Sequence, residues 1–349
     1  MAFGWMILLF DRAPVVFTLT VNQPPLVSII IAAPPEMEEV QALAAARDLD
    51  WPADRKEIIL ARGRQPSAQR NAALRAARGS WVYFLDDDAL PGAGILRHAE
   101  KWFSKPEVAL IGGPNLCPES APWLEKVFSV VLGSWLAFGP SRARYRQTGK
   151  PRYSSEKELI LCNTLARRDV LLAFGGFNEA LYPNEENALM DDLQKAGHLL
   201  VYDPGFFVHR RPRKSVGAFL KMLRTYGRGR AEQFRLHPTP GSILNFVPPL
   251  FCLYGVLLAG LVLSGPRHVS PFIMNMAAVP LAVYLMAVLA QTLSNMAANG
   301  VCRACAAAPL LPACHCLYGI GFWIGLLTPL NSMKNPKAPS VSLEIKNQA

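Results

Sequence analysis

The apolar and charged positions divide the chain of 349 residues into two parts of different character. From Leu236 to Met333 the sequence carries only two formal charges, Arg267 and Arg303. The uncharged runs beside these arginines each exceed the roughly 20 residues that a membrane-spanning helix needs. We therefore expect a membrane region at 236–333, followed by a tail at 334–349. The region should contain three transmembrane helices, at about Ile243–Leu263, Phe272–Leu293 and Ala306–Leu330.

The part before the membrane region alternates the patterns of buried strands and of helices. Short, nearly continuous apolar runs are typical of strands that are buried on both faces. Such runs occur at Leu26–Ala33, Glu57–Ala61 and Trp81–Leu85. The segments between them predict helices at Glu36–Arg47 and at Pro66–Arg78, the second of which has proline at its start, where a helix tolerates it best.

This alternation indicates an α/β domain with a doubly wound, mostly parallel sheet. We place the domain at 26–235, after an N-terminal extension at 1–25. The apolar run Ala2–Phe10 in that extension is too short to span a membrane. In sheets of this class, ligands bind outside the carboxyl ends of the strands.

The net charge of +10 is concentrated just before the membrane region. Between Gly205 and Arg235 there are nine Lys or Arg residues and one acid, Glu232. The positive-inside rule places this basic segment, 205–235, in the cytosol. The α/β domain would then be cytosolic in a multi-pass protein of the inner membrane, and the C-terminal tail would lie outside. A membrane surface explains the basic segment better than a nucleic acid, so no nucleic-acid partner is expected.

Three further features leave alternatives open. The segment Trp123–Phe138 is either an ordinary core helix or a helix at the membrane surface. The positions Val216, Phe219, Leu220 and Leu223 share one face of a helix, which favours a helix lying on the membrane. The cysteines of the membrane region either form a zinc site or are small apolar residues of a helix; they are Cys302, Cys305, Cys314 and Cys316.

Three acids follow the third predicted strand directly. Asp86 and Asp88 bracket Asp87, so this alternate pair can point the same way into a cleft. Carboxylates placed so closely repel one another unless a cation neutralises them. A divalent cation held there would stabilise a departing diphosphate as a Lewis acid. The sequence therefore predicts a metal site at Asp86 and Asp88.

Several segments resemble family 2 glycosyltransferases with the GT-A fold. They occur in the order of that family and cover most of 26–235; they are LVSIIIAA, PSAQRNAALRAARG, WVYFLDDDALP and GGFNEALYPNEENALMDDLQKAG. The pair CNTLARRDVL and YGRGR before membrane helices is similar to the membrane-anchored bacterial branch that assembles polysaccharides on lipid carriers. The resemblance implies an enzyme that uses a nucleoside-diphosphate sugar with Mn²⁺ or Mg²⁺.

On the donor side, the resemblance implies roles for five positions. Asp86 and Asp88 fall on the metal motif, and His209 falls where the family places a further metal ligand. Arg70 and Asn71 fall on the pair that approaches the nucleotide. Arg70 is also expected to face the cleft from the first turns of its helix, where a guanidinium can bind a diphosphate.

On the acceptor side, Glu186 falls on the family's catalytic base, and Glu185 is the second candidate. This chain has Glu where the family usually has Asp. Arg228 and Arg230 lie in a motif where processive relatives carry Gln-x-x-Arg-Trp. We expect the glycines of this motif to let the backbone approach a phosphate that the two arginines bind.

One segment departs from the family. Acids that usually follow the second strand and recognise the nucleoside are replaced here by 61–65, which reads Ala-Arg-Gly-Arg-Gln. The nucleotide of the donor is therefore open. The first hypothesis is an inverting transferase that acts on a lipid-linked or polysaccharide acceptor. The alternatives are a processive polysaccharide synthase and a non-catalytic membrane scaffold.

Overall fold

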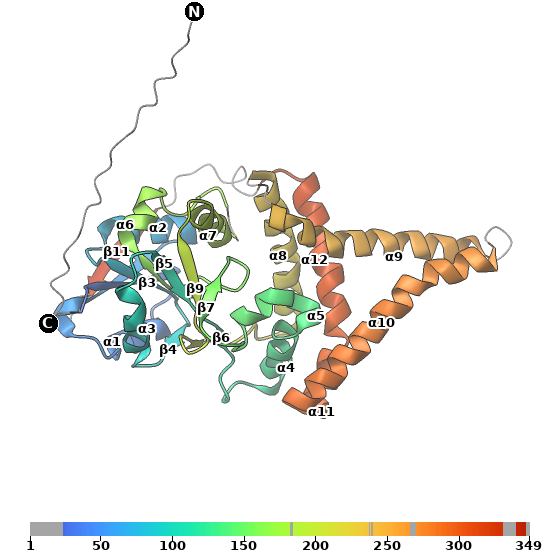
Figure 1. The fold of residues 1–349 in the computed structure, drawn as a ribbon, viewed down its shortest axis with the longest axis horizontal. Coiled ribbons are helices and arrows are strands. Elements are labelled where there is room, and N and C mark those ends of the chain that lie inside the picture. The colour runs from blue at the N-terminus through green and yellow to red at the C-terminus, as the bar shows by residue number, and fades with distance from the viewer. Residues whose placement is uncertain are drawn as a thin grey trace, which may run out of the picture.

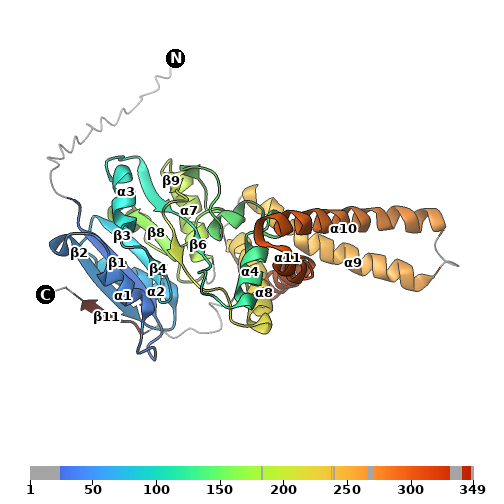
Figure 2. The same cartoon turned by 90° about the horizontal axis from the view of Figure 1, so that it is seen from below.

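The computed structural model describes residues 24–181, 184–236, 238, 240–265, 270–330 and 340–346. The predicted extension at 1–25 lies outside the described residues except for its last two positions. An α/β domain and a group of C-terminal helices lie side by side, and two of the helices project away from the domain as a long hairpin (Figures 1 and 2).

The α/β domain contains a sheet of eight strands in the described part of the chain, in the order β11-β2-β1-β3-β8-β5-β9-β7. The strands β2, β1, β3, β5 and β9 share one direction, and β8, β7 and β11 run against it. This confirms the mostly parallel sheet. The bounds are β1 Val27–Ala33, β2 Lys56–Arg62, β3 Trp81–Asp86, β5 Val108–Gly112, β7 Arg152–Ser154, β8 Asn163–Arg167, β9 Leu199–Tyr202 and β11 Ser342–Lys346.

Helices cover both faces of this sheet. The side chains of Ile29 and Ile31 lie in a buried cluster with residues of α1 and α3, whereas Ile30 lies in a second cluster with residues of α2, α6 and α7. Successive residues of a strand point to opposite faces, so β1 is buried on both sides, as its continuous apolar run predicts. The helix bounds are α1 Gln41–Arg47, α2 Pro66–Ala76, α3 Ile95–Phe103, α6 Arg168–Ala173 and α7 Glu185–Lys195.

A small second sheet lies beyond the end of β3. It consists of β4 (Leu90–Pro91), β10 (Val208–His209) and β6 (Asn115–Leu116), with β10 in the middle. Because β10 pairs with β4, which follows the three acids in sequence, the basic segment begins beside those acids.

One predicted helix of the α/β domain is divided in the structure. The segment Trp123–Phe138 forms α4 (Trp123–Leu132) and α5 (Trp135–Phe138), which are separated at Gly133 and Ser134. Phe128 of α4 is fully buried, while Trp123 and Trp135 are exposed. The prediction of an ordinary core helix therefore holds for the face of α4 that points into the protein.

The membrane region forms three helical stretches that are long and apolar enough to cross a membrane, at Ile243–Ser264, Pro271–Asn299 and Val301–Leu327. This confirms the three predicted apolar helices. The third stretch is divided by Ala308 and Pro309. The helices are α9 Val247–Ser264, α10 Pro271–Asn299, α11 Val301–Ala307 and α12 Leu310–Leu327.

The basic segment continues into α8, Val216–Leu236, which packs against α4 and α12. Phe219 stacks on Phe128 with 4.3 Å between the ring centroids, and Leu223 lies in the same buried cluster as Leu311. The apolar face that we expected on the membrane therefore meets other helices of the protein over much of its length.

The C-terminal tail pairs with the α/β domain. Residues 342–346 form β11, which runs antiparallel to β2, and the Arg62 guanidinium binds the Glu344 carboxylate. One sheet cannot be shared across a membrane. The expectation that the tail lies on the opposite side from the α/β domain is therefore wrong.

Candidate functional site

Arginines neutralise the acids at the end of β3. Arg210 bridges two of them: its Nη1 lies 3.0 Å from Oδ2 of Asp86, and its Nε lies 2.6 Å from Oδ1 of Asp88. Arg70 donates from Nη2 to Oδ1 of Asp86 at 2.9 Å. Burial would raise the pKa of Asp86, but Arg210 and Arg70 hold that pKa below its ordinary value. Asp86 and Asp88 are therefore neutralised by arginines, whereas burial and these two neighbouring acids raise the pKa of Asp87.

His209, the third predicted metal ligand, lies on β10 next to Arg210. Its ring packs edge-on against Phe207, with 5.5 Å between centroids, and its Nδ1 is buried without a hydrogen-bond partner among the described residues. In that part of the chain, no three side chains of His, Cys, Asp or Glu are placed to hold a metal ion. The predicted set is thus not assembled here, because Arg210 takes the position between Asp86 and Asp88. The carboxylates themselves remain suitable ligands for Mg²⁺ or Mn²⁺.

Arg70 also connects the metal motif to Glu185, the second candidate for the base. Its Nη1 donates to Oε1 of Glu185 at 2.8 Å. Asn71, beside it on α2, donates to the carbonyl oxygen of Phe177 at 2.8 Å and accepts a hydrogen bond from the backbone N–H of the same residue. Asn71 also donates to the carboxylate of Glu179 at 2.9 Å. In this structure Asn71 thus holds the loop before α7, and a contact with the nucleotide stays a prediction.

The two candidate bases begin α7 but differ in their surroundings. Glu185 is buried, and burial together with the neighbouring Glu186 raises its pKa to about 7. Glu186 is partly exposed and lines a cavity. The residue before them, Asn184, has φ = 101°, the left-handed region that a non-glycine residue rarely adopts. Such a conformation fixes how the chain enters α7 and so directs Glu185 inward and Glu186 to the cavity.

The cavity at Glu186 has a volume of about 580 Å³ and lies between the α/β domain and the C-terminal helices. Its polar wall includes Arg144 and Arg230. Arg144 is held by carbonyl oxygens of residues 156 and 157 and by Oδ1 of Asn187. Burial, and then the nearby Arg144, lower the pKa of Arg230, so an anion would be favoured beside this pair. The apolar wall comes from helices α5, α8, α9 and α12 and includes Trp135, Leu223, Val247, Pro248 and Tyr318.

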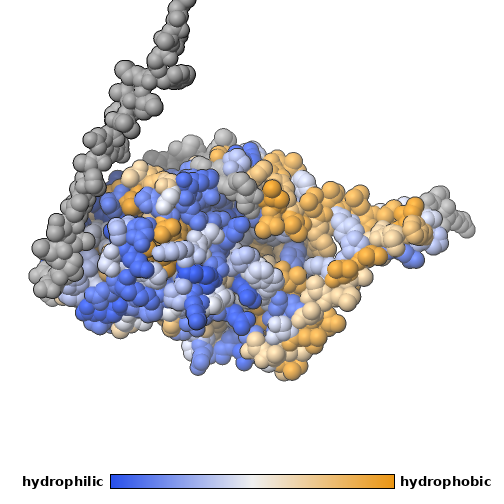
Figure 3. Space-filling view, in the orientation of Figure 1, coloured by the Kyte–Doolittle hydropathy of each residue, from blue (hydrophilic) through white to orange (hydrophobic). Residues whose placement is uncertain are grey.

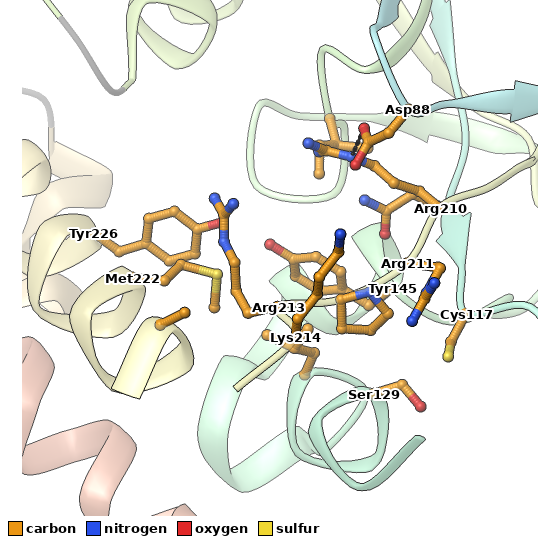
Figure 4. Close-up of a pocket in the computed structure, with 15 residues that line it drawn as sticks. Asp88, Cys117, Ser129, Tyr145, Arg210, Arg211, Arg213, Lys214, Met222 and Tyr226 are labelled. Carbon is orange, nitrogen blue, oxygen red and sulfur yellow. Dashed lines mark hydrogen bonds and ion pairs between the residues drawn. The ribbon is translucent and has the colours of Figure 1, made fainter. Parts of the chain in front are cut away.

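A second cavity, of about 340 Å³, lies at the acids (Figure 4). Asp88 and Arg210 face it, and Arg211, Arg213 and Lys214 add positive charge along the segment that leads to α8. Tyr145, Ile160 and Tyr226 line both cavities, which therefore adjoin one another. The arrangement places a pocket rich in basic side chains next to a pocket that is partly apolar.

The two arginines of the Tyr-Gly-Arg-Gly-Arg motif at 226–230, which lies in α8, have different surroundings. Arg230 lines the larger cavity, whereas Arg228 binds Glu232 at 2.9 Å and the carbonyl oxygen of Pro329 at 3.3 Å. Gly227 packs against α12, where a Cβ atom would overlap the carbonyl oxygen of Tyr318. The close approach that Gly227 permits is therefore an approach to α12 in this structure, where we expected a phosphate.

The sequence interpretation missed Arg210, Arg144 and Tyr226. The run Arg-Arg-Pro-Arg-Lys at 210–214 signalled a basic patch but not which member would bind the acids. In the sequence, Arg144 is one of several arginines after the predicted helix Trp123–Phe138, and nothing there distinguishes it from the others. Only the folded chain brings these residues to the two cavities.

Comparisons with known proteins bear on both the fold and the family. The mannosyltransferase PcManGT from Pyrobaculum calidifontis, in complex with GDP-Man and Mn²⁺, is 17% identical, with a TM-score of 0.52 over 88% of this chain and 88% of that chain. TarS from S. aureus, in complex with UDP-GlcNAc, is 12% identical, with a TM-score of 0.40 over 58% of this chain and 66% of that chain. No curated protein matches by sequence.

The first of these likenesses supports the GT-A fold. A family model described as glycosyltransferase like family 2 matches residues 13–227, which is more than half of the chain and includes Arg70, the three acids and both candidate bases. The protein therefore belongs to the family 2 glycosyltransferases.

Proposed function

We propose that this glycosyltransferase is inverting and metal-dependent, and that it transfers a sugar from a nucleoside diphosphate to a lipid-linked acceptor at the cytosolic face of a membrane. The observation that carries the proposal is the cavity at Glu186. One of its walls is the α/β domain, and the other is made by helices of the membrane region. A carboxylate placed there can act on a hydroxyl group that a lipid presents from the membrane.

The smaller cavity is suited to the donor. Asp86 and Asp88 would hold Mn²⁺ or Mg²⁺ in the place that the Arg210 guanidinium takes in this structure, and the cation would supply positive charge to the leaving diphosphate. The structure of the mannosyltransferase from Pyrobaculum calidifontis contains Mn²⁺ with GDP-Man, which supports a cation of this kind. Arg213 and Lys214 face the same cavity and can bind phosphate oxygens, whereas Arg211 binds the carboxylate of Glu125. The charged groups of this cavity favour a diphosphate, but they do not select the nucleobase of the donor.

The larger cavity is suited to an amphipathic acceptor. Arg144 and Arg230 can bind an anionic group close to Glu186, and the apolar wall can contact a hydrocarbon chain. As the acceptor oxygen bonds to the anomeric carbon, Glu186 takes its proton, and the bond to the diphosphate oxygen breaks with its electron pair. A single displacement of this kind inverts the anomeric carbon.

The proposal is tested with the full-length protein in detergent. Thermal stability is measured with a panel of GDP- and UDP-sugars, with Mn²⁺, with Mg²⁺ and with a chelator, because the true donor should stabilise the folded state by mass action. The stabilising donor is then incubated with a polyprenyl phosphate and with a lipid-linked sugar, and release of the nucleoside diphosphate and the anomer of the product are measured.

We expect metal-dependent release with at least one lipid and a product of inverted configuration. Full activity in the presence of chelator would contradict the role of the metal. Transfer to water-soluble sugars alone would contradict the lipid acceptor, and a retained anomer would contradict the direct displacement.

A further inference from the structure

The path of the chain after α8 limits how often it crosses the membrane. α8 follows the α/β domain directly, and β11 returns to β2 of the same domain over residues 342–346. The start and the end of this path therefore lie on one side of the membrane. The number of crossings between them must be even, although three stretches are long and apolar enough to cross.

The packing of α12 against α8 shows which stretch does not cross. The two helices lie side by side (Figure 1), and a Cβ atom on Gly321 or Gly325 would overlap the carbonyl oxygen of Arg224 or Arg228. Arg235 of α8 donates to the carbonyl oxygens of Gly325 and Thr328, at 3.0 and 2.7 Å. The backbones of α8 and α12 are therefore in direct contact.

The charges of α8 cannot be accommodated in the hydrocarbon layer. This helix carries six charged side chains, and each Arg or Lys placed at the centre of a bilayer strongly disfavours insertion. Because α12 lies along α8, the two helices must lie at the same depth. Those side chains are Lys221, Arg224, Arg228, Arg230, Glu232 and Arg235.

α9 and α10 have the opposite character. Neither contains Asp, Glu, Lys or Arg. In the most apolar 18-residue segment of each stretch, 6% and 0% of the residues are buried in the protein, against 33% for the stretch that contains α12. At about 1.5 Å per residue, their apolar stretches of 22 and 29 residues are sufficient for a hydrocarbon layer of about 30 Å. They project from the rest of the molecule with an apolar surface (Figure 3).

We propose that the chain crosses the membrane twice, through α9 and α10, and that α12 lies with α8 at the level of the lipid head groups on the side of the α/β domain. The positive-inside rule agrees with this topology, because Arg303 and the three lysines of the tail join the basic segment on one side. Arg267, in sequence between α9 and α10, remains on the other side. The larger cavity, which residues of α9 and α12 line, then opens at the head-group level.

The first test maps the sides of the membrane. In a full-length chain whose native cysteines are replaced, single cysteines are placed at Glu119 in the α/β domain, at Ser264 at the end of α9 and after residue 349. A membrane-impermeant maleimide is applied to right-side-out and inverted vesicles. We expect the first and third positions to react from one side and Ser264→Cys from the other. Labelling of the C-terminal cysteine from the side opposite Glu119→Cys would overturn the topology, as would labelling of all three from one side.

A second test uses the chain with its native cysteines. Arg62 and Ser342 are Cα partners in the β2–β11 pair, so the double variant R62C/S342C should form a disulfide in membranes, which neither single variant can form. Absence of this crosslink under oxidising conditions would contradict the return of the tail.

A third test measures depth. Nitroxide labels at Val256 in α9 and at Ile320 in α12 report on two exposed positions near the middle of their helices. We expect the label in α9 to respond to oxygen, which concentrates in the hydrocarbon layer, and the label in α12 to respond to a water-soluble nickel complex. Equal depth at the two positions would show that α12 crosses as well.

Discussion

The two cavities that meet at Tyr145 and Tyr226 are built from different parts of the chain and differ in chemistry. The smaller one is formed around the end of β3 and the basic run that follows β10, and its charged lining is Asp88, paired with Arg210, together with further basic side chains. The larger one joins the start of α7 to four helices, and its lining is partly charged, with both basic and acidic side chains, and partly apolar. One pocket is thus suited to a diphosphate and the other to a lipid, with Glu186 on the lipid side.

The largest effect on the donor side is expected from Asp88→Asn. The side chain of Asp88 is 42% exposed and faces the smaller cavity, so its loss should leave the fold intact. An amide cannot supply the charge that holds a divalent cation, and kcat/KM should fall by about 10²–10³-fold, with loss of stimulation by Mn²⁺. Asp87→Asn, at the neighbouring position, is the matched control and should retain most of the activity. Near-normal turnover of Asp88→Asn with Mn²⁺ would remove the metal site.

On the acceptor side, Arg230→Met should raise KM for the lipid acceptor by about 10–100-fold, because a charge-assisted hydrogen bond contributes about 1.5–3 kcal/mol. Affinity for the donor should stay unchanged. Arg224→Met changes an exposed arginine of the same helix and should leave both constants within about twofold. If Arg230→Met weakened binding of the donor and left binding of the acceptor unchanged, the larger cavity would have to bind the donor and the smaller one the acceptor.

The packing of the acceptor wall is tested by two glycines of α8. Gly227→Ala should push α8 away from Tyr318 and destabilise the protein by about 1–3 kcal/mol, as overpacking does. Gly217→Ala places a methyl group where no atom lies within 4 Å, and it should stabilise the helix by about 0.5–1 kcal/mol. Thermal unfolding in detergent measures both. A loss of stability at Gly217 equal to that at Gly227 would show that the effect is not contact with α12.

The smallest effect concerns Glu185 and pH. Its pKa is raised to about 7 in the folded protein, so between its ordinary value near 4.5 and pH 7 the folded state binds more protons than the unfolded state. Stability from this group is therefore present at low pH and is lost as pH rises towards 7. The Tm of the wild type relative to Glu185→Gln should fall by a few degrees from pH 5 to pH 7.5. A difference that is constant over this range would mean that Glu185 keeps one protonation state.

The donor side was largely predictable because its signals are local in sequence. Apolar runs identified β1, β2 and β3, and the acids at the end of β3 follow from position alone. The structure adds that Arg210, and not the adjacent His209, faces those acids. His209 ends β10 and Arg210 follows it, and neighbouring residues of an extended chain point to opposite sides, so the sequence alone does not show which of the two faces the acids. The role of His209 as a metal ligand stays a prediction.

The acceptor side and the path of the tail were not predictable in the same way. Five residues at 342–346 carry no local signal that they pair with a strand some 280 residues earlier. In this pair Arg62, which lies in the segment that departs from the family, binds Glu344. Gly227 was assigned to a phosphate because a glycine permits close approach by any partner. Which partner approaches it depends on tertiary packing of α8 with α12.

The central claim is that Glu186 serves the acceptor and not the donor, and Glu186→Gln tests it most directly. The amide preserves shape and hydrogen bonding but cannot take a proton. We predict that kcat falls by about 10²–10⁴-fold, the usual contribution of a general base, while the Kd of the donor sugar nucleotide, measured with Mn²⁺ by calorimetry, stays within about twofold. Glu185→Gln, measured alongside, should lower kcat less. An equal loss of donor affinity and kcat in Glu186→Gln would contradict the account and make Glu186 part of the donor site.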